Sequence, residues 1–297
     1  MTRPARLSVG IISAGRVGSV LGAALTRAGH TVLATSGVSR DSLRRAEELL
    51  PEAALLGPDE VAARADLVLL AVPDDALAGL VRGLVATGSL RPGQIVVHTS
   101  GANGVSVLAP AAEVGALTLA LHPAMTFTGR AEDLHRIAAC CVGVTAASDE
   151  EAAWSVGEAL VVEMGAEPVR VPEAARALYH AALTHGANHL ATLVNECTDL
   201  LRGAGIAHAD RIIAPLLSAS LDNALRHGDR ALTGPVSRGD SGTLRAHVSV
   251  LRRTAPEVVP SYLELARRTA HRAADVGLLR ADAFTDVVSV LDEESKS

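Results

Sequence analysis

The N-terminal segment of the chain reads as a strand, a turn containing glycine and a helix. The apolar run LSVGII at 7–12 predicts a buried strand, SAGR at 13–16 predicts the turn, and a helix follows as far as Gly29. Further apolar runs recur along the first half of the chain, at 31–35, 66–72, 94–99 and 116–121. These runs are continuous rather than alternating, which is typical of parallel strands buried on both faces.

Helix-period segments separate these runs, at 16–28, 40–49, 59–64, 74–86 and 104–113. Two more apolar runs, at 140–145 and 168–171, flank a helical stretch around 149–164 and extend the sheet. From Glu173 onward the sequence predicts helices alone, at 173–203, 208–227, 240–253, 257–276 and 280–292. We therefore expect an α/β domain with a mostly parallel sheet over residues 1–171, followed by an all-α domain over 172–297.

The composition excludes several classes of function. With a net charge of −6, no run of Lys or Arg, and only two Phe, two Tyr and one Trp, the chain lacks the basic surface and stacking side chains of a nucleic-acid-binding protein. No apolar run is long enough to span a membrane and no signal-peptide pattern occurs, so we expect a cytoplasmic protein without a membrane partner. The three cysteines form no C-x-x-C pair, so we expect neither disulfides nor a cysteine metal site.

The turn SAGRVG stands where a dinucleotide-binding fingerprint reads G-x-G-x-x-G, with Ser13 in the place of the first glycine. The second and third glycines of the fingerprint are kept; they let the backbone approach a pyrophosphate and let the helix pack on the strand. A serine costs little at the first position unless the turn requires a positive φ. The setting predicts that a dinucleotide binds at the start of the helix, in contact with Ser13, Ala14, Gly15, Arg16, Val17 and Gly18.

The segment LATSGVSR after the second strand bears on which dinucleotide binds. An NAD-binding chain carries Asp or Glu here for the ribose 2′-hydroxyl, but no carboxylate occurs before Asp41. Ser36, Ser39 and Arg40 match a 2′-phosphate, and Arg16 in the first turn could add a second positive charge, so the sequence favours NADP. Ser39 or Asp41 could also cap the next helix with Arg40 solvated, and the two roles are compatible.

Polar side chains follow the next strands, at the edge of the sheet where ligands bind. The third strand ends at Ala71, Val72 and Pro73, which we expect beside the cofactor, and Asp74 or Asp75 can cap the helix after them. A histidine at such a place is as often a structural residue as a catalytic one. The two later strand ends project five polar side chains toward the same crevice: His98, Ser100, Asn103, His122 and Thr126.

Six segments carry a family resemblance: GIISAGRVG, LLAVPDD, VVHTSGANG, LALHPAMTFTG, LYHAALTHGANH and ALTGPVSRGDSGTLRAH. Together they resemble the Rossmann-like proteins with a C-terminal DUF2520 domain, a bacterial group in the 6-phosphogluconate dehydrogenase-like superfamily. The first two segments are shared with that superfamily, which includes pyrroline-5-carboxylate and ketopantoate reductases, and the last two are specific to the group. The resemblance implies a Rossmann-type fold, an NADP-linked oxidoreductase and a helical second domain that often forms a homodimer. It implies no particular substrate.

Ketopantoate reductases and β-hydroxyacid dehydrogenases of this superfamily carry Lys-x-x-x-Asn on a catalytic helix, and Asn188 matches the asparagine. Thr184 stands in the place of the lysine, and Lys296 is the only lysine in the chain. His180 precedes Thr184 and Asn188 at i, i+4 and i+8 spacing on one face of the predicted helix, so we expect it to donate the proton instead. We expect Asn188 and Ser100 to hold the reacting polar atom.

Two further groups of residues each have two interpretations. His185 and His189 have the spacing of zinc ligands, but Gly186 replaces the glutamate of H-E-x-x-H and no third ligand is evident, so we expect no metal. The histidines of this helix could instead form hydrogen bonds at a helix–helix or dimer interface. In the segment at 232–247, either Asp240 caps a helix and pairs with Arg238, or Arg238 binds a substrate carboxylate.

Taken together, these residues predict an NADP-dependent reductase that transfers a hydride to a C=O or C=N bond of a small metabolite bearing a carboxylate. The alternative is an NADP(H)-binding sensor or scaffold without catalytic activity, which the missing lysine favours and the polar strand ends oppose. Ketopantoate reduction is a narrower candidate, by superfamily analogy alone.

Overall fold

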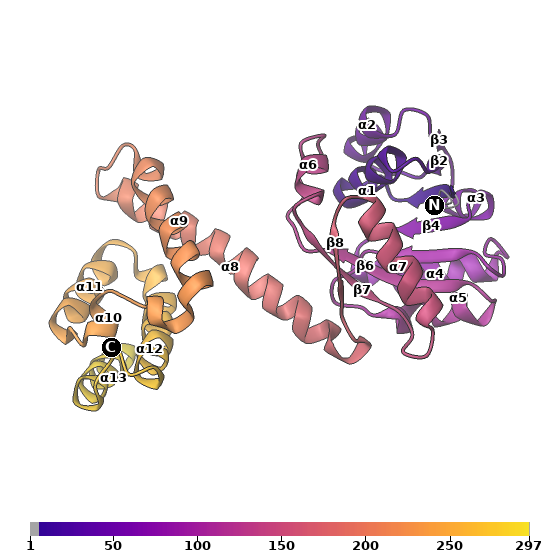
Figure 1. Ribbon diagram of the computed structural model, residues 1–297. Helices are drawn as coiled ribbons and strands as arrows, with labels where there is room; N and C mark the ends of the chain where they lie inside the picture. Colours follow the sequence, from indigo (N-terminus) through magenta and orange to yellow (C-terminus); the bar gives the residue numbers. More distant parts are fainter. Residues whose placement is uncertain (1–5, 297) are drawn as a thin grey trace. The chain divides into compact units, whose positions relative to one another are not determined.

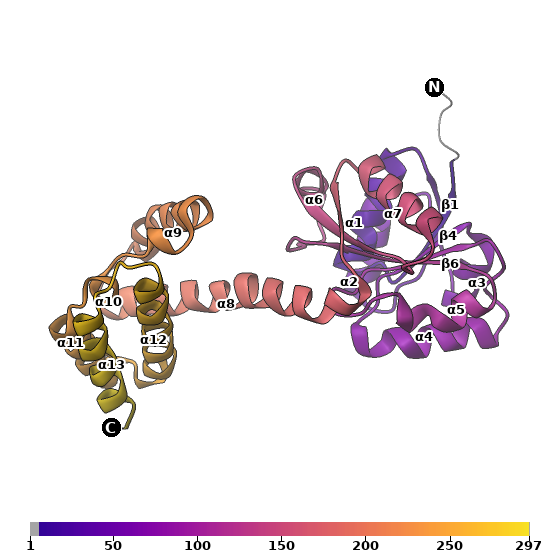
Figure 2. The same ribbon diagram turned by 60° about the horizontal axis from the view of Figure 1, so that its bottom comes forward.

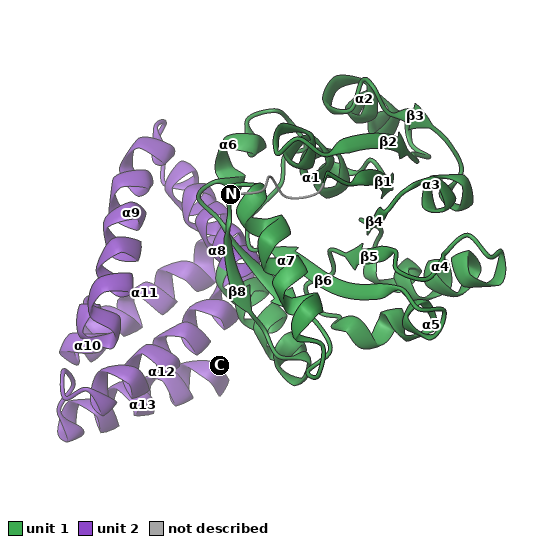
Figure 3. Cartoon of the chain, turned by 45° about the vertical axis from the view of Figure 1, so that its right-hand side comes forward, with its two compact units in different colours: residues 1–186 green, residues 187–297 purple. Residues whose placement is uncertain are grey.

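The computed structural model describes residues 6–296 (Figure 1). The chain forms two compact units, residues 1–186 and 187–297, which are coloured separately in Figure 3. The first unit contains a single eight-stranded sheet in the order β3-β2-β1-β4-β5-β6-β7-β8. The strands are β1 Ser8–Ile12, β2 Thr31–Thr35, β3 Ala54–Leu55, β4 Leu67–Leu70, β5 Ile95–His98, β6 Leu117–Pro123, β7 Cys141–Thr145 and β8 Glu167–Arg170.

All neighbouring strands run parallel except β6 and β7, which pair antiparallel from Ala120 opposite Thr145 to Pro123 opposite Val142. The carboxyl ends of β1, β4, β5 and β6 therefore meet at one edge of the sheet, where β1 is followed by the turn, β5 ends at His98 and β6 carries His122 next to its last residue. This mostly parallel sheet confirms the predicted α/β class of the first domain.

Helices cover both faces of the sheet because its central strands are apolar on both sides. Apolar side chains of α1 (Arg16–Arg27) and α7 (Glu151–Glu163) pack on one face. Those of α3 (Pro58–Arg64), α4 (Asp74–Ala86), the 3-10 turn η1 (Val105–Leu108) and α5 (Ala109–Glu113) pack on the other (Figure 2). Helix α2 (Arg40–Leu49) lies beside α1, and α6 (Asp133–Ile137) follows β6.

Three local features differ from the expectations. Neither β3, a two-residue exposed edge strand, nor α6, a five-residue helix, was predicted, because both are too short to show a period. Asp74 and Asp75 do not cap α4. Pro73 occupies the N-cap position, and the two carboxylates lie in the first turn, where the helix dipole favours negative charge.

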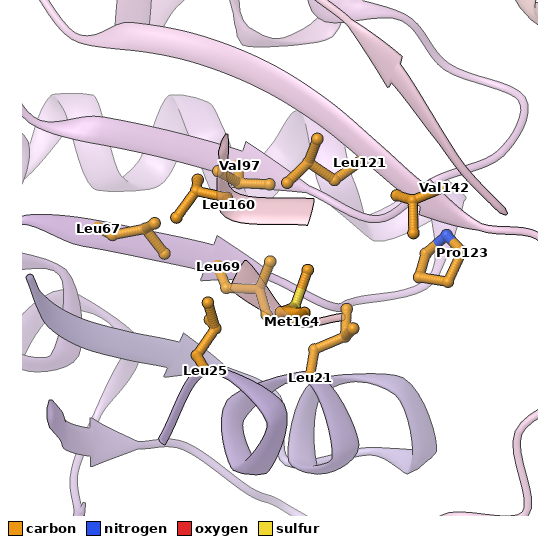
Figure 4. Close-up of a pocket in the computed structure, with 10 residues that line it drawn as sticks. All are labelled: Leu21, Leu25, Leu67, Leu69, Val97, Leu121, Pro123, Val142, Leu160 and Met164. Carbon is orange, nitrogen blue, oxygen red and sulfur yellow. The ribbon is translucent and has the colours of Figure 1, made fainter. Parts of the chain in front are cut away.

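The interior of the first unit is closely packed. Ten side chains from α1, the strands and the C-terminal end of α7 surround a void of about 10 Å³; Figure 4 shows how they lie. Leucine, valine, proline and methionine side chains line it completely. A void of this size holds at most one water molecule, so it belongs to the core and not to a ligand site.

From Arg176 to Lys296 every described element is a helix, which confirms the predicted all-α C-terminal region. The α-helices are α8 Arg176–Gly203, α9 Ala209–His227, α10 Pro235–Arg238, α11 Ser241–Thr254, α12 Val259–Asp275 and α13 Ala281–Lys296, and short 3-10 turns lie at Glu173–Ala175, Gly228–Ala231 and Pro256–Val258. The apolar core of this region comes chiefly from α10 to α13. The boundary expected at residue 171 falls where the sheet ends, whereas the compact units divide at Gly186, inside α8. No helix in the described chain is long and apolar enough to cross a membrane.

Candidate functional site

The turn after β1 is held against the end of β2. Ser13 donates its backbone N–H to Ser36 Oγ (3.0 Å), and Ala14 donates its N–H to the Ser36 carbonyl (2.7 Å). Ser13 has φ +79°, and it is the one residue other than glycine with a positive φ among residues 6–296. The turn therefore does require the backbone conformation that the first glycine of the fingerprint supplies, and a serine adopts it at an energetic cost.

The two remaining glycines of the turn differ in their surroundings. A Cβ on Gly18 would lie 2.1 Å from the Ser13 carbonyl and 3.0 Å from Ala71 Cβ, so only glycine lets α1 pack this closely. A Cβ on Gly15 would meet only Ser13 Oγ, at 3.4 Å, so the space beside this backbone is open. Gly15 is the N-cap of α1, and no side chain caps the helix. The free N–H groups of the first turn thus face an open approach beside Gly15.

The other expected cofactor residues surround this turn. Ala14 is buried, Val17 is half-buried and Arg16 is an exposed first residue of α1. Ala71, at the end of β4, donates its N–H to the Ile12 carbonyl (3.0 Å), which places the segment Ala71–Pro73 next to the turn.

The loop between β2 and α2 uses its serines for local structure. The hydroxyl of buried Ser36 faces the turn, as its bond to Ser13 shows. Ser39 is the N-cap of α2, and its hydroxyl accepts the Ser42 N–H at 3.1 Å, in agreement with the capping role considered from the sequence. Arg40 is exposed. Contact of Ser36, Ser39 and Arg40 with a 2′-phosphate stays a prediction.

The loop after β5 is organised around a buried neutral histidine. His98 Nδ1 accepts the Ser100 N–H (3.1 Å), so the other ring nitrogen, Nε2, carries the proton and donates it to the Gly104 carbonyl (2.8 Å). Burial lowers the pKa of His98 to about 4. Ser100 Oγ accepts both the backbone N–H and the side-chain amide of Asn103 (3.0 and 2.9 Å). His98 is therefore a structural residue that positions Ser100.

A second pair of histidines meets over the backbone of the same loop. The rings of His122, at the end of β6, and His180, on α8, lie edge to face with centroids 5.8 Å apart. A Cβ on Gly101 would lie 2.5 Å from His180 Cδ2 and 2.8 Å from His122 Nε2, so both imidazoles approach this glycine. The Tyr179 hydroxyl lies 3.0 Å from His122 Nδ1. We call His122, Tyr179 and His180 the histidine cluster.

The electrostatics of the histidine cluster favour neutral groups. Burial, and after it the positive charge of Arg176, lowers the pKa of His122 to about 4. Burial also raises the pKa of Tyr179. At neutral pH the cluster therefore presents an uncharged imidazole beside a protonated phenol.

The buried guanidinium of Arg176 supports the cluster from beneath. Its Nε donates to Thr145 Oγ1 (2.7 Å), and one terminal nitrogen donates to the carbonyls of Ala120 (2.9 Å) and Gly143 (3.2 Å). The guanidinium carbon lies 5.7 Å from the centre of the Tyr179 ring. Arg176 thus ties the first turn of α8 to the antiparallel pair of β6 and β7.

Glu173 makes a second connection between the start of α8 and the sheet. Its carboxylate accepts the N–H groups of Val105 and Ser106 at the start of η1 (2.7 and 3.1 Å). Sequence reasoning missed Glu173, Arg176 and Tyr179. The position of Tyr179 directly before His180 is a signal that could have revealed it.

Three of the expected site residues, Ser100, His122 and His180, lie near one another in the first unit. Thr126 is exposed on the loop after β6. Asn188 and Arg238 belong to the second unit and are exposed there.

The segment at 232–247 is explained in part by local structure. Asp240 is the N-cap of α11 and accepts the Thr243 N–H (3.0 Å), as expected. The expected ion pair between Arg238 and Asp240 is not formed within 4 Å in the described chain.

The described residues contain no group of three His, Cys, Asp or Glu placed to hold a metal ion.

Substitutions at Ser13 test the strain in the turn. Ser13→Ala keeps a Cβ in the left-handed conformation, whereas Ser13→Gly removes it. The free energy of unfolding of the glycine variant should therefore be about 1 kcal/mol higher than that of the alanine variant. Urea unfolding of both purified proteins measures the difference. Equal stabilities would show that the turn relaxes to a negative φ.

The buried imidazole of His98 predicts a loss of stability in acid. Its pKa is about 4 in the folded chain and about 6.5 when unfolded, so the unfolded state takes up the proton first as the pH falls. Stability from this group is full above pH ~6.5 and declines toward pH ~4, by at most about 1.4 kcal/mol per pH unit. His98→Gln should therefore flatten the dependence of the unfolding free energy on pH in this window. An unchanged slope would contradict the assignment.

Two family models match the chain, and the second match begins within the first compact unit. Residues 1–123 match the family model of the Rossmann-like domain, and residues 140–269 match that of the domain of unknown function DUF2520. A search of curated proteins gives no match.

Several solved structures share the fold. A Bacteroides fragilis protein named as a candidate NADP oxidoreductase superposes with a TM-score of 0.74 at 22% identity, over 89% of this chain and 98% of that chain. An imine reductase from Pseudomonas sp. gives 0.67 at 18% identity, over 96% and 100%. The Plasmodium falciparum pyrroline carboxylate reductase with NADP bound gives 0.57 at 10% identity, over 95% and 98%.

At these identities the similarity to solved structures establishes the fold, and the two family models establish the order of the domains. The chain is a Rossmann-like protein with a C-terminal DUF2520 domain, the group that its motifs resemble.

Proposed function

We propose that this protein is a reductase that uses NADP(H) to reduce a C=O or C=N bond in a small metabolite bearing a carboxylate. The observation that carries the proposal is the pairing of two features at one edge of the sheet. The open, uncapped start of α1 follows β1. Ser100 follows β5, and His122 at the end of β6 meets His180 of α8. In open α/β sheets a dinucleotide crosses this edge, with its pyrophosphate on the first helix.

The residues at the start of α1 fit a dinucleotide. The space that a Cβ on Gly15 would enter is open, and the N–H groups of the first turn have no capping side chain, so a pyrophosphate could accept their hydrogen bonds. Ser13 to Gly18 and Ala71 to Pro73 would hold the cofactor. When bound, the reduced nicotinamide supplies a hydride.

The side chains of the cluster have complementary roles in this proposal. His180 donates a proton to the oxygen or nitrogen of the reduced bond, which gains negative charge as the hydride arrives. Neutral His122, fixed through its hydrogen bond to Tyr179, orients the substrate without adding charge. The Ser100 hydroxyl accepts two N–H bonds and keeps its own proton to donate to the reacting atom. Asn188 and Arg238 are proposed for orientation and for the substrate carboxylate.

The names of several structural neighbours support this class of chemistry. The names pyrroline carboxylate reductase and imine reductase both denote enzymes that reduce a C=N bond, and the structure of the former has NADP bound. A panel of small cyclic imines and 2-oxo acids is therefore the first choice of substrates.

The panel tests the proposal through the absorbance of NADPH. We expect oxidation with at least one substrate, and we expect His180→Ala to lower that rate by about a hundredfold or more while the Kd of NADPH is unchanged. His208→Ala, on the exposed segment between α8 and α9, is the matched control. Tight NADPH binding with no oxidation of any substrate would favour a nucleotide-sensing protein, and full activity in His180→Ala would remove His180 from the mechanism.

We also propose that the protein is a homodimer. Only Arg176 is buried among the 28 residues of α8, and on α9 the side chains of Leu216 and Leu225 are 62% and 80% exposed. Exposed leucines at this density are typical of a surface that a partner covers.

Sedimentation analysis tests the homodimer. Leu216→Glu should shift the protein toward a monomer, because a carboxylate would have to be buried in the interface. Val162→Glu changes an apolar residue of α7 with a similar exposure, 60%, and should leave the mass unchanged. A monomeric wild-type protein at micromolar concentration would contradict the proposal.

A further inference from the structure

The hydroxyl of Tyr179 determines which ring nitrogen of His122 carries the proton. It lies 3.0 Å from His122 Nδ1 and forms no other hydrogen bond in the part of the chain that the structure describes. Burial raises the pKa of Tyr179, so the phenol keeps its proton at neutral pH. Because Nδ1 is its one acceptor among the described residues, Tyr179 donates to Nδ1, and the proton of the neutral imidazole lies on Nε2.

His122 Nε2 and the Ser100 hydroxyl are two donors without an acceptor. Nε2 forms no hydrogen bond within residues 6–296, and it would lie 2.8 Å from a Cβ on Gly101. Ser100 directly precedes Gly101 and is buried. Its oxygen accepts two N–H groups of Asn103, which occupy both lone pairs, and its own proton has no acceptor in the described chain. Both groups can therefore donate a hydrogen bond to a ligand, and neither can accept one.

This pair of donors distinguishes a C=O bond from a C=N bond. A carbonyl oxygen has two lone pairs and can accept both hydrogen bonds at once. An imine nitrogen has one lone pair. The protonated iminium, the form that accepts a hydride more readily, has none and needs an acceptor for its own N–H. A buried donor left without an acceptor costs free energy, so the site matches the carbonyl.

The charges around His122 favour the same bond. Burial is the main cause that lowers its pKa to about 4, and Arg176, His180 and His98 lower it further, whereas Asp74 in the first turn of α4 raises it. An iminium beside this ring has the same sign of charge as an imidazolium and meets the same penalty. Negative charge that develops on a carbonyl oxygen is instead stabilised by the two donors.

We propose that this site reduces the C=O bond of a 2-oxo acid, with the carbonyl oxygen held by the Ser100 O–H and the His122 Nε2–H. The inference rests on the proposed function and narrows its choice between C=O and C=N. Tyr179 is a positioning residue that acts through His122. The carbonyl carbon receives a hydride from the reduced nicotinamide, the π electron pair moves to oxygen, and the oxygen takes a proton from His180 to form a hydroxyl. His180 regains its proton from solvent.

Substrates that share a carbon skeleton test the bond type through the absorbance of NADPH. 2-Oxopentanoate and 2-oxohexanoate are compared with the cyclic imino acids 1-pyrroline-2-carboxylate and 1-piperideine-2-carboxylate. We expect the better oxo acid to exceed the better imino acid in kcat/KM by roughly tenfold or more, the effect of one lost hydrogen bond. A higher kcat/KM for an imino acid would overturn the inference and leave the proposed reductase in place. Oxidation by neither class would overturn the proposed function, and the inference with it.

Nitrogen NMR of the full-length protein labelled with ¹⁵N-histidine reads the tautomer without turnover. The His122 signals, assigned with His122→Gln, should show a protonated Nε2 and an unprotonated Nδ1 that accepts a hydrogen bond. Tyr179→Phe should move Nδ1 to the position of a nitrogen without such a bond. It should also lower kcat/KM for the oxo acid by about tenfold, because the ring is no longer fixed, and leave the Kd of NADPH unchanged.

The second Tyr–His pair of the chain supplies the matched control. Tyr262→Phe removes a hydroxyl that lies 2.8 Å from His247 Nδ1 and should change neither the His122 signals nor kcat/KM. A thermal melt of each variant verifies that it is folded. A protonated Nδ1 on His122 in the wild type, or His122 signals unchanged in Tyr179→Phe, would overturn the inference even if the protein reduces other substrates.

Discussion

The arrangement of the histidine cluster depends on one buried cation. Arg176 forms no ion pair with a described carboxylate, and its charge is stabilised by three oxygen acceptors and the face of Tyr179. Two of these acceptors are carbonyls of β6 and β7, so a single side chain spans the place where the sheet changes from parallel to antiparallel. Because Arg176 is the first residue of α8, the same contacts position Tyr179 and His180, which lie three and four residues later, about one helical turn away.

This arrangement gives the two ends of the candidate site opposite electrostatic character. At the histidine end, burial and, after it, the positive charge of Arg176 keep His122 uncharged at neutral pH. At the other end, beyond the start of α1, Arg16, Arg45 and Arg130 line a groove and form no ion pair with a carboxylate in the described chain. A neutral, partly buried cluster suits hydride and proton transfer, whereas a cationic groove open to solvent suits a phosphate. The free N–H groups at the start of α1 belong to the same edge of the sheet as both groups of residues.

Periodicity was sufficient to predict the main strands and helices, because buried parallel strands appear as continuous apolar runs. It could not reveal that β7 reverses direction, since an apolar run reads the same in either orientation. The cofactor turn was located from three residues, but the positive φ of Ser13 is a property of the folded turn. His98 was selected as a functional candidate and proves to be structural, because its two nitrogens are satisfied within its own loop. Arg176 was missed because arginine is almost never fully buried, and nothing in its neighbours in sequence marks the exception.

The conformation of Ser13 also bears on how such chains are recognised. A search pattern that requires glycine at the first position excludes chains in which another residue adopts the same positive φ. Asparagine, aspartate and serine can hold that angle too, at a modest penalty that a well-packed neighbourhood absorbs. The stricter requirement is at Gly18, where no side chain fits at all. Patterns anchored on the third glycine, with tolerance at the first, should therefore recover lineages that the usual signature overlooks.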